Sequence, residues 1–344
     1  MTTPPAESPA PLILLCPGQG AQAVGMGRAW CEASPAAAAT MRTADTILAG
    51  RFPKPLSAIC FEGPEELLNR TDVAQPAIYA VSVACFRAKF GEGAGSGNGT
   101  ARDEARGSEV RIAAAAGLSL GEYTALHLAG CFSFEDGLEL VALRGKAMQD
   151  AAVAVPSGMV ALIGADRAQA EAVCEAVLGT KEARNAAGEV LVPANFNAPG
   201  QVVLSGTASA CDRAVEAAGK LGLRASKLAV AGAFHSPLMA PAGEKLRVAL
   251  ERTPIREPRC VVMSNVLGRA YGGEAGSRIG DGVQRIRELL VEQLTSPVLW
   301  SDDCAWLVEN VKGEFHELAP GKVLTGLMRR ISRETKVVNH DVPS

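Results

Sequence analysis

Two apolar runs in this sequence each lead into a glycine-flanked turn and then into a helical pattern. The first run, Leu12–Cys16, precedes Pro17–Gly20 and a helical stretch through Trp30. The second run, Val110–Ala116, precedes the turn Gly117-Leu-Ser-Leu-Gly121 and another helical stretch. A buried strand, a tight turn and a helix in repeated succession are typical of a parallel sheet covered by helices. The chain is therefore predicted to have an α/β fold.

Between residues 156 and 228 the succession of elements changes. Strand alternation and helical periodicity there predict the order β-α-β-β-α-β, which is that of a ferredoxin-like subdomain. The expected elements are a strand at Met159–Ile163, a helix at Ala168–Leu178, strands at Val190–Asn195 and Gln201–Ser205, a helix at Ala208–Lys220 and a strand at Ala225–Val230. The α/β pattern then returns, with a strand at Cys260–Asn265, a helix around Val283–Leu294 and a strand near Glu314–Leu318.

The segment Phe90–Ser108 is rich in glycine and charged residues and holds few apolar ones. A composition of this kind has little apolar surface to bury, and it is typical of long connections without structure of their own. We expect a mobile surface loop there, without a chemical role.

Charge and composition exclude several classes of protein. The 34 Lys and Arg residues against 37 Asp and Glu give a net charge of −3, which is too small and of the wrong sign to hold nucleic acid. The apolar runs fall well short of the roughly 20 residues that cross a bilayer. The nine cysteines stand too far apart in sequence to form a thiolate cluster for a metal, and we expect them to be reduced. Met1–Pro11 holds no Lys or Arg, so we expect no secretory leader.

A helix is predicted to begin at the capping-box-like segment Ser133–Asp136 and to reach about Asp150. Its apolar positions on one face are Leu138, Val141, Ala142 and Met148. Arg144 lies off that face, so helical spacing alone places this side chain in solvent.

The turn around Ser119 has the form of a nucleophile elbow. Glycines at both flanks let the backbone turn sharply and lift the serine hydroxyl away from the sheet. The amide N–H of Leu120 then lies at a helix N-terminus, where it can donate to an oxyanion. The same five-residue pattern also fits a plain strand–helix turn, and a catalytic serine requires a base.

The sequence offers four histidines as that base, namely His127, His235, His316 and His340. His127 follows Ser119 on the same helix at about 12 Å along the axis, so we expect it to be structural. His316 falls inside a strand, and His340, close to the end of the sequence, is expected to be frayed. His235 follows a strand and precedes Pro237, in a loop position where catalytic groups collect. It is the favoured base by elimination.

Six segments together carry a resemblance to a known family. They are Pro17-Gly-Gln-Gly-Ala-Gln22, Gly117-Leu-Ser-Leu-Gly-Glu-Tyr-Thr-Ala-Leu126, Arg144-Gly-Lys-Ala-Met-Gln149, Asn195-Phe-Asn-Ala-Pro-Gly-Gln201, Ala233-Phe-His-Ser-Pro-Leu-Met239 and Pro320-Gly-Lys-Val-Leu-Thr-Gly326. In this order they resemble the malonyl-CoA:acyl carrier protein transacylases of type II fatty acid synthesis. The resemblance spans about Leu12–Ile331 and is closest to the plastid-type enzymes, which share the Gly117-Leu-Ser-Leu variant.

The resemblance implies a role for each residue of a ping-pong acyl transfer. Ser119 would be the nucleophile that becomes a malonyl ester, and His235 the base that activates it. The main-chain carbonyl of Gln293 would orient the histidine in place of an acidic residue. The amides of Gln19 and Leu120 would form the oxyanion hole.

The resemblance also implies the residues that select the substrate. Arg144 would pair with the free carboxylate of the malonyl group through a planar, bidentate fork. Phe234 would leave little room for an α-methyl group and so favour malonyl over methylmalonyl. Asn197 would line the pocket from the small subdomain, although a turn asparagine fits the same position.

Taken together, these inferences predict a large α/β-hydrolase-like domain with a central parallel sheet, formed by residues 12–155 and 229–344. A small ferredoxin-like subdomain would be inserted at residues 156–228, after a flexible N-terminal tail at residues 1–11. The implied partners are malonyl-CoA and acyl carrier protein, with no cofactor, no metal, no nucleic acid and no membrane. We expect a monomer located in the plastid stroma, or otherwise in the cytoplasm.

Two positions depart from the family pattern. Cys16 stands where an aromatic residue is more common, which leaves a thiol near the proposed oxyanion loop. Ala319 stands where glycine is usual before Pro320. Neither departure removes a catalytic group.

Three alternatives remain open at the level of sequence. A serine hydrolase or thioesterase of α/β-hydrolase type would use an acid between Ser119 and His235, and the available residues are Asp136, Asp150, Asp166 and Asp212. A dinucleotide-binding dehydrogenase has a loose match at Gly18-x-Gly20-x-x-Ala23, but Pro17 and the absence of an acidic residue near position 38 oppose it. An acyltransferase-like scaffold without activity is disfavoured because the complete set of expected site residues is present.

Overall fold

The computed structural model describes residues 10–91, 100–103, 108–179, 188–272 and 282–343. The predicted N-terminal tail, residues 1–11, lies outside this range except for its last two residues. Within the described residues, no helix is long and apolar enough to span a membrane.

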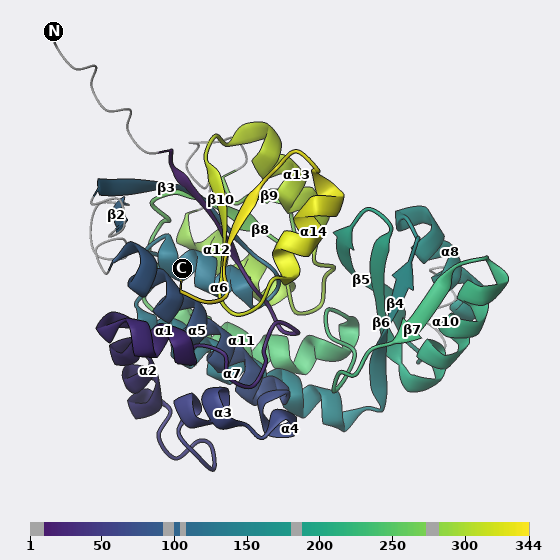
Figure 1. Ribbon diagram of the computed structural model, residues 1–344. Helices are drawn as coiled ribbons and strands as arrows, with labels where there is room; N and C mark the ends of the chain where they lie inside the picture. The colour runs from purple at the N-terminus through teal and green to yellow at the C-terminus, as the bar shows by residue number, and fades with distance from the viewer. Residues whose placement is uncertain (1–9, 92–99, 104–107, 180–187, 273–281, 344) are drawn as a thin grey trace, which may run out of the picture.

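A seven-stranded sheet forms the centre of the larger part of the molecule, with the order β11-β10-β1-β3-β8-β9 and β2 beside β3 (Figure 1). Its strands are β1 (Leu12–Cys16), β2 (Thr100–Asp103), β3 (Ser108–Gly117), β8 (Val261–Ser264), β9 (Arg269–Ala270), β10 (Glu314–Leu318) and β11 (Val337–His340). The five strands from β11 to β8 are parallel, whereas β2 and β9 pair antiparallel to their neighbours. The predicted α/β fold is confirmed, but the sheet is mixed rather than wholly parallel.

Helices cover both faces of this sheet, as the alternation of side chains along β1 requires. The helices of this part are α1 (Arg28–Ala33), α2 (Pro35–Ile47), α3 (Leu56–Glu62), α4 (Glu65–Leu68), α5 (Thr71–Phe90), α6 (Gly121–Leu128), α7 (Phe134–Ala154), the 3₁₀ turn η2 (Pro237–Met239), α11 (Ala240–Arg252), α12 (Val283–Glu292), α13 (Trp300–Asn310) and α14 (Val323–Ile331). Leu12 and Leu14 face a core that includes α2, α5 and α7, while Ile13 and Leu15 face α13 and α14.

Two local predictions need correction. The helix expected to follow Pro17–Gly20 begins only at Arg28, because Gly20, Gly25 and Gly27 all adopt positive φ and break the helical path. In the segment predicted as a loop, Thr100–Asp103 forms β2, which pairs antiparallel with the start of β3. Residues 92–99 and 104–107 of that segment lie outside the described residues.

A second, four-stranded antiparallel sheet stands to one side of the central sheet, drawn in teal in Figure 1. It has the strand order β5-β6-β4-β7 and the predicted succession β-α-β-β-α-β. Its elements are β4 (Ser157–Ile163), α8 (Arg167–Leu178), β5 (Leu191–Ala198), β6 (Gln201–Thr207), α10 (Ala208–Lys220) and β7 (Arg224–Lys227). The two helices pack on one face of this sheet around a separate apolar core.

Main-chain hydrogen bonds join the two parts of the molecule. The amide of Phe196 in β5 donates to the carbonyl of Val298 at 2.9 Å, and the amide of Val298 donates to the carbonyl of Ala194 at 2.8 Å. The segment that leads into α13 therefore continues the edge of the small sheet. Nearby, Arg167 of α8 forms an ion pair of 3.0 Å with Asp302 of α13.

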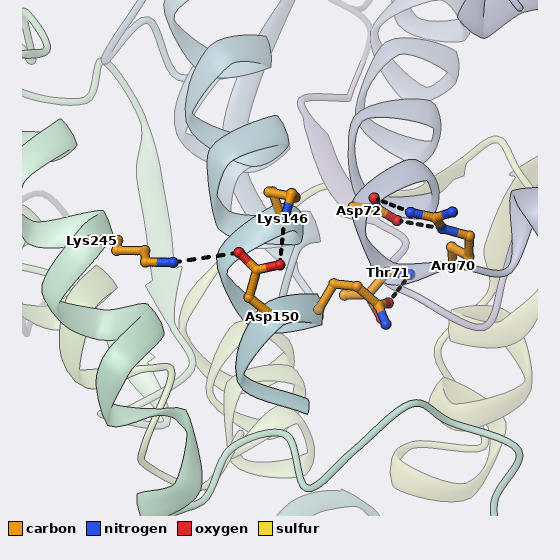
Figure 2. Close-up of polar contacts among 7 residues, drawn as sticks. Arg70, Thr71, Asp72, Lys146, Asp150 and Lys245 are labelled. Atoms are coloured by element: carbon orange, nitrogen blue, oxygen red, sulfur yellow. Dashed lines mark hydrogen bonds and ion pairs between the residues drawn. The ribbon is translucent and has the colours of Figure 1, made fainter. Parts of the chain in front are cut away.

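Helix α7 runs through the larger part and contacts both α5 and α11. Figure 2 shows Asp150 of α7 between Lys146 of the same helix and Lys245 of α11, to which its carboxylate is paired. On the other side, the amide of Thr71 at the start of α5 donates to Gln149 of α7 at 3.2 Å. These contacts fix the helix that carries Arg144 against its two neighbours.

Candidate active site

Ser119 lies at the sharp turn between β3 and α6. Its φ of +52° is in the left-handed region, and among the described residues other than glycine only His235, at +57°, shares this property. The turn closes because glycines stand where the elbow meets the loop after β1: a Cβ on Gly121 would stand 2.1 Å from the carbonyl oxygen of Cys16. A Cβ on Gly18 would stand 2.2 Å from the carbonyl oxygen of Leu118. The elbow and the loop after β1 are thus in backbone contact.

His235 meets Ser119 from the loop that follows the small sheet. Its Nε2 lies 2.8 Å from the serine Oγ, and its Nδ1 lies 2.8 Å from the main-chain oxygen of Gln293. A carbonyl only accepts, so Nδ1 carries the proton and Nε2 is left to accept the serine hydroxyl. Burial, together with the charge of Arg144, lowers the pKa of His235 to about 4. The imidazole is therefore neutral, as a general base must be.

The histidine loop is itself held by serine side chains. Ser236 Oγ donates to the carbonyl of Ala233 at 2.7 Å, and Ser205 of β6 donates to the carbonyl of Phe234. The positive φ of His235 is sustained by these bonds, as a strained residue at a functional site requires.

Arg144 is buried, with 1% of its surface exposed, and so corrects the expectation from helical spacing. Helix α7 packs against both α5 and α11, and the face on which the sequence places Arg144 points into the site. One Nη donates to Gln75 of α5 at 2.7 Å, and the other donates to Ser119 Oγ at 3.1 Å and to Gln293 Oε1 at 2.8 Å. The guanidinium also lies 5.5 Å from the ring of Tyr123. A fixed, desolvated cation thus stands beside the hydroxyl of Ser119.

Gln293, the residue after α12, connects the parts of this site. Besides its carbonyl to His235 and its Oε1 to Arg144, its Nε2 donates to the carbonyl of Ser119 at 3.0 Å and to Glu122 at 2.6 Å. The role expected for its main chain agrees with this geometry. The use of its side chain was not predicted.

Several site residues escaped the sequence analysis. Asn265, directly after β8, accepts from the amide of Ser119 at 2.7 Å and donates to the carbonyl of Gly117 at 2.9 Å, which braces both sides of the elbow. Gln75 is wholly buried in α5, and Glu122 is almost wholly buried in the first turn of α6. A polar residue at a strand end and polar residues within apolar helices were the available signals.

A cavity of about 390 Å³ opens at Ser119 between the central and the small sheet. Among its lining residues are Gln19, Leu120, Arg144, Asn197, Phe234 and His235. The loop after β1 is held over the cavity by Gln22, whose side chain accepts from the amide of Gly20 at 2.7 Å and donates to Asn69 at 2.9 Å. The residues expected in the site therefore line this cavity, except Gln293, which contacts Arg144 and His235.

The other three histidines are remote from the serine. His127 is buried beside the carbonyl of Phe132 at 3.0 Å, and burial lowers its pKa to about 4. His340 is not frayed: it is buried in β11, and its Nε2 lies 2.9 Å from Nδ1 of His316. The sequence position suggested a free end, but the parallel pairing of β11 with β10 orders it.

None of the four aspartates available to the hydrolase alternative orients His235. Asp136 accepts from the Ser133 hydroxyl in the first turn of α7, and Asp166 caps α8. Asp150 pairs with two lysines, and Asp212 pairs with Lys227. Cys16 is fully buried, which raises the pKa of its thiol far above the usual value, and it is inert as a nucleophile. In the part of the chain described here, no group of three or more His, Cys, Asp or Glu side chains could hold a metal ion.

Comparisons with known proteins agree with this geometry. The profile of the family described as acyl transferase domain matches residues 13–341. The malonyl CoA-acyl carrier protein transacylase of Bacillus subtilis (strain 168) is 37% identical over 328 residues, which are 95% of this chain and 92% of the relative.

Solved structures show the same similarity. The malonyl-CoA:acyl carrier protein transacylase from Xanthomonas oryzae pv. oryzae matches with a TM-score of 0.82 and 37% identity, covering 98% of this chain and 96% of that one. A malonyl-transacylase solved in complex with the acyl-carrier protein of a type II PKS matches with a TM-score of 0.80 and 35% identity, covering 97% of both chains.

Proposed function

This chain belongs to the acyl transferase domain family, and we propose that it transfers the malonyl group of malonyl-CoA to the phosphopantetheine thiol of acyl carrier protein. The reaction supplies malonyl units for fatty acid synthesis, and the resemblance noted from sequence is confirmed at the level of the family. The observation that carries the catalytic assignment is the joint contact of Ser119 Oγ with His235 and Arg144.

The first half-reaction loads the enzyme. Ser119 Oγ attacks the thioester carbonyl carbon while Nε2 of His235 takes the hydroxyl proton. The C–S bond then breaks, and the proton passes from the imidazolium to the departing CoA thiolate. The products are free CoA and a malonyl ester on Ser119.

The second half-reaction reverses these roles. The thiol of the phosphopantetheine group gives its proton to His235, and its sulfur attacks the ester carbonyl. Cleavage of the C–O bond returns the proton to Ser119 and leaves the malonyl group as a thioester on the carrier protein. The thioester of the substrate is already activated, so the reaction needs no cofactor or metal.

Two main-chain amides would stabilise the tetrahedral intermediates. Leu120 directly follows the nucleophile at the start of α6, where its N–H is not used by the helix. Gln19 lies on the loop pressed against the elbow, and its side chain is held by Thr71 at 3.2 Å. Both residues line the cavity at Ser119.

Arg144 would bind the free carboxylate of the malonyl group. Three of the five N–H groups of a guanidinium are used by Gln75, Ser119 and Gln293, and Nε has no partner. A monocarboxylic acyl group would make no charge-assisted hydrogen bond to this buried cation, which favours malonyl over acetyl.

Two further residues of the cavity wall have proposed roles. Phe234, which precedes the catalytic histidine, would exclude an α-methyl group, and comparable transfer rates from malonyl-CoA and methylmalonyl-CoA would reject this role. Asn197 of β5 lines the same cavity, and its Oδ1 is buried without a partner, which is consistent with a contact to the substrate.

Intact-mass spectrometry after brief exposure to malonyl-CoA tests the proposal. We expect one malonyl adduct on the wild type, none on Ser119→Ala, and discharge of the adduct by phosphopantetheinylated carrier protein. Equal loading from acetyl-CoA would reject the role of Arg144. Rapid release of CoA without any adduct would favour the hydrolase or thioesterase alternative.

We also propose a ferredoxin-like small part, a hydrolase-like large part, a monomeric state and a location in the plastid stroma. The strand order of the small sheet supports the ferredoxin-like description, and the elbow on a mainly parallel sheet supports the hydrolase-like one. A monomer is expected, which size-exclusion chromatography with light scattering checks. The plastid stroma has only the Gly117-Leu-Ser-Leu variant in its favour, and the relatives named above with their organisms are bacterial.

A further inference from the structure

Glu122 is a buried carboxyl group to which the reaction as described assigns no role. It lies on α6 with 1% of its surface exposed. Its Oε2 accepts from Gln293 Nε2 at 2.6 Å, while Oε1 of the same Gln293 accepts from Arg144 at 2.8 Å. One amide group thus separates the buried carboxyl of Glu122 from the buried cation of Arg144.

The groups around Glu122 come from five different elements. Tyr271 after β9 donates its hydroxyl to Oε1, and the amide of Asn265 after β8 donates to Oε2 at 3.3 Å. Gln293 after α12 is the third donor, and Arg144 of α7 acts on Glu122 through its charge. Asp303 of α13 is a second carboxyl nearby, and burial together with the charge of Glu122 raises its pKa well above the usual value.

The charges of this region balance only while no substrate is present. Arg144 supplies one buried positive charge, and ionised Glu122 supplies one negative charge. A malonyl carboxylate seated at Arg144 adds a second negative charge in the same low-dielectric space, where like charges cannot both remain ionised without a large penalty.

We propose that Glu122 is a positioning residue that takes up one proton when the malonyl group is seated at Arg144. This inference rests on the proposed function. In the free enzyme the carboxylate holds Gln293 so that its Oε1 faces Arg144. In the malonyl-enzyme a proton from solvent joins the carboxylate of Glu122, and the total charge of the site is unchanged by loading.

The surrounding hydrogen bonds accommodate both states. A protonated Oε1 can donate to the Tyr271 hydroxyl, which accepts as well as donates, while Oε2 continues to accept from Gln293. Burial, opposed by the hydrogen bonds from Tyr271 and Gln293, raises the pKa of Glu122 to about 7. The proton is therefore available near neutral pH.

The test is the equilibrium constant for loading from malonyl-CoA, measured by intact mass between pH 6.5 and pH 8.5 in wild type and Glu122→Gln. Uptake of one proton makes the constant of the wild type fall by nearly tenfold per pH unit above about pH 7. The neutral amide introduced by the substitution removes this dependence. Ionisation of the released CoA thiol affects both proteins equally, so the ratio of the two constants isolates Glu122. Glu292→Gln, an exposed change on the neighbouring residue of Gln293, should behave as wild type.

Equal pH dependence of the loading constant in wild type and Glu122→Gln would overturn the inference. A decrease of that constant by the same factor at every pH would overturn it as well. If Glu122→Gln does not fold, Tyr271→Phe provides the second test. Loss of the Tyr271 hydroxyl removes a donor to the carboxylate, so the midpoint of the pH dependence should move upward, and an unchanged midpoint overturns the inference. Absence of a malonyl adduct at every pH would overturn the proposed function as well.

Discussion

Arg144 Nη2 donates to Ser119 Oγ over 3.1 Å, so the cation proposed to bind the substrate carboxylate also contacts the proposed nucleophile. The same nitrogen donates to Gln293, whose main chain orients His235. The residues proposed for recognition and for activation therefore share one network of hydrogen bonds.

Arg144→Ala should abolish the preference for malonyl-CoA. Loss of a buried, charge-assisted pair to the substrate carboxylate costs about 2–5 kcal/mol, so kcat/KM for malonyl loading should fall by roughly 30-fold or more. Loading from acetyl-CoA, which makes no such pair, should change far less. The measurement is the ratio of the two loading rates, with Lys146→Ala, an exposed change on the same helix, as control. An unchanged ratio would show that the carboxylate binds elsewhere.

The reactivity of Ser119 should hold from neutral pH down to about pH 5 and then fall as His235 is protonated. Its folded pKa of about 4 lies below the usual value of 6.5, so the neutral base persists in mildly acidic solution. A neutral sulfonyl fluoride, which makes no demand on Arg144, is the suitable probe of the rate. Arg144→Gln removes a cation that lowers this pKa, so the midpoint should move to higher pH. A midpoint near 6.5 in the wild type would contradict the buried, neutral histidine.

The same shift has a consequence for stability. Because the folded pKa of His235 is depressed, the unfolded chain binds a proton that the folded one does not between about pH 6.5 and pH 4. Folding is therefore disfavoured progressively as the pH falls through this window. Thermal unfolding of wild type and His235→Gln at pH 7 and pH 5 checks it: the wild type should lose more stability on acidification than the variant.

Gln293→Ala should separate recognition from activation. The substitution keeps the carbonyl that orients His235 but removes the side-chain bonds to Arg144 and Glu122. Hydrogen bonds to charged groups contribute about 1.5–3 kcal/mol, so malonyl loading should fall by roughly 10- to 100-fold. Modification of Ser119 by the sulfonyl fluoride should fall much less. Gln284→Ala on the exposed face of α12 is the matched control. Equal losses in both assays would mean that the side chain also positions the histidine.

Gly121→Ala should prevent the elbow from closing. The new Cβ would stand 2.1 Å from the carbonyl oxygen of Cys16, which is main chain and cannot move aside. We expect a loss of unfolding free energy greater than the about 1–3 kcal/mol of ordinary overpacking, together with loss of Ser119 labelling. Gly219→Ala in α10, where nothing lies within 4 Å, should leave stability unchanged or raise it slightly. Similar melting temperatures for the two variants would contradict this account of the turn.

The strands β1 and β3 and the glycine turns after them were predictable because their signals are local. An apolar run followed by glycine marks both β1 and β3, and the observed β1 has the predicted bounds. The confirmed family likewise followed from motifs of a few residues each. Among the helices between residues 28 and 90, α5 gave no such signal, since it is apolar on nearly every face and carries no period.

The site was harder to predict, because its contacts join segments that are far apart in the sequence. Arg144 and Gln75 are separated by 69 positions, and Ser119 and Asn265 by 146. Helical spacing therefore placed Arg144 in solvent, although a second helix covers that face. The prediction that His340 is frayed was wrong for the same reason. The strand β11 is ordered by its partner β10 and by Trp30, which donates to the carbonyl of His340 at 3.0 Å.

The main-chain bonds between Phe196 and Val298 also bear on how substrates enter. They join the small sheet to the segment before α13, beside the cavity. The small sheet and the larger part of the molecule, which form the two walls of the cavity, therefore cannot separate without breaking main-chain hydrogen bonds. Binding a thioester then has no need to bring distant surfaces together or to order them. The free energy of binding is therefore available for the proposed contact between Arg144 and the malonyl carboxylate. An acyl group without a carboxylate would enter a preformed cavity in which it cannot make that contact.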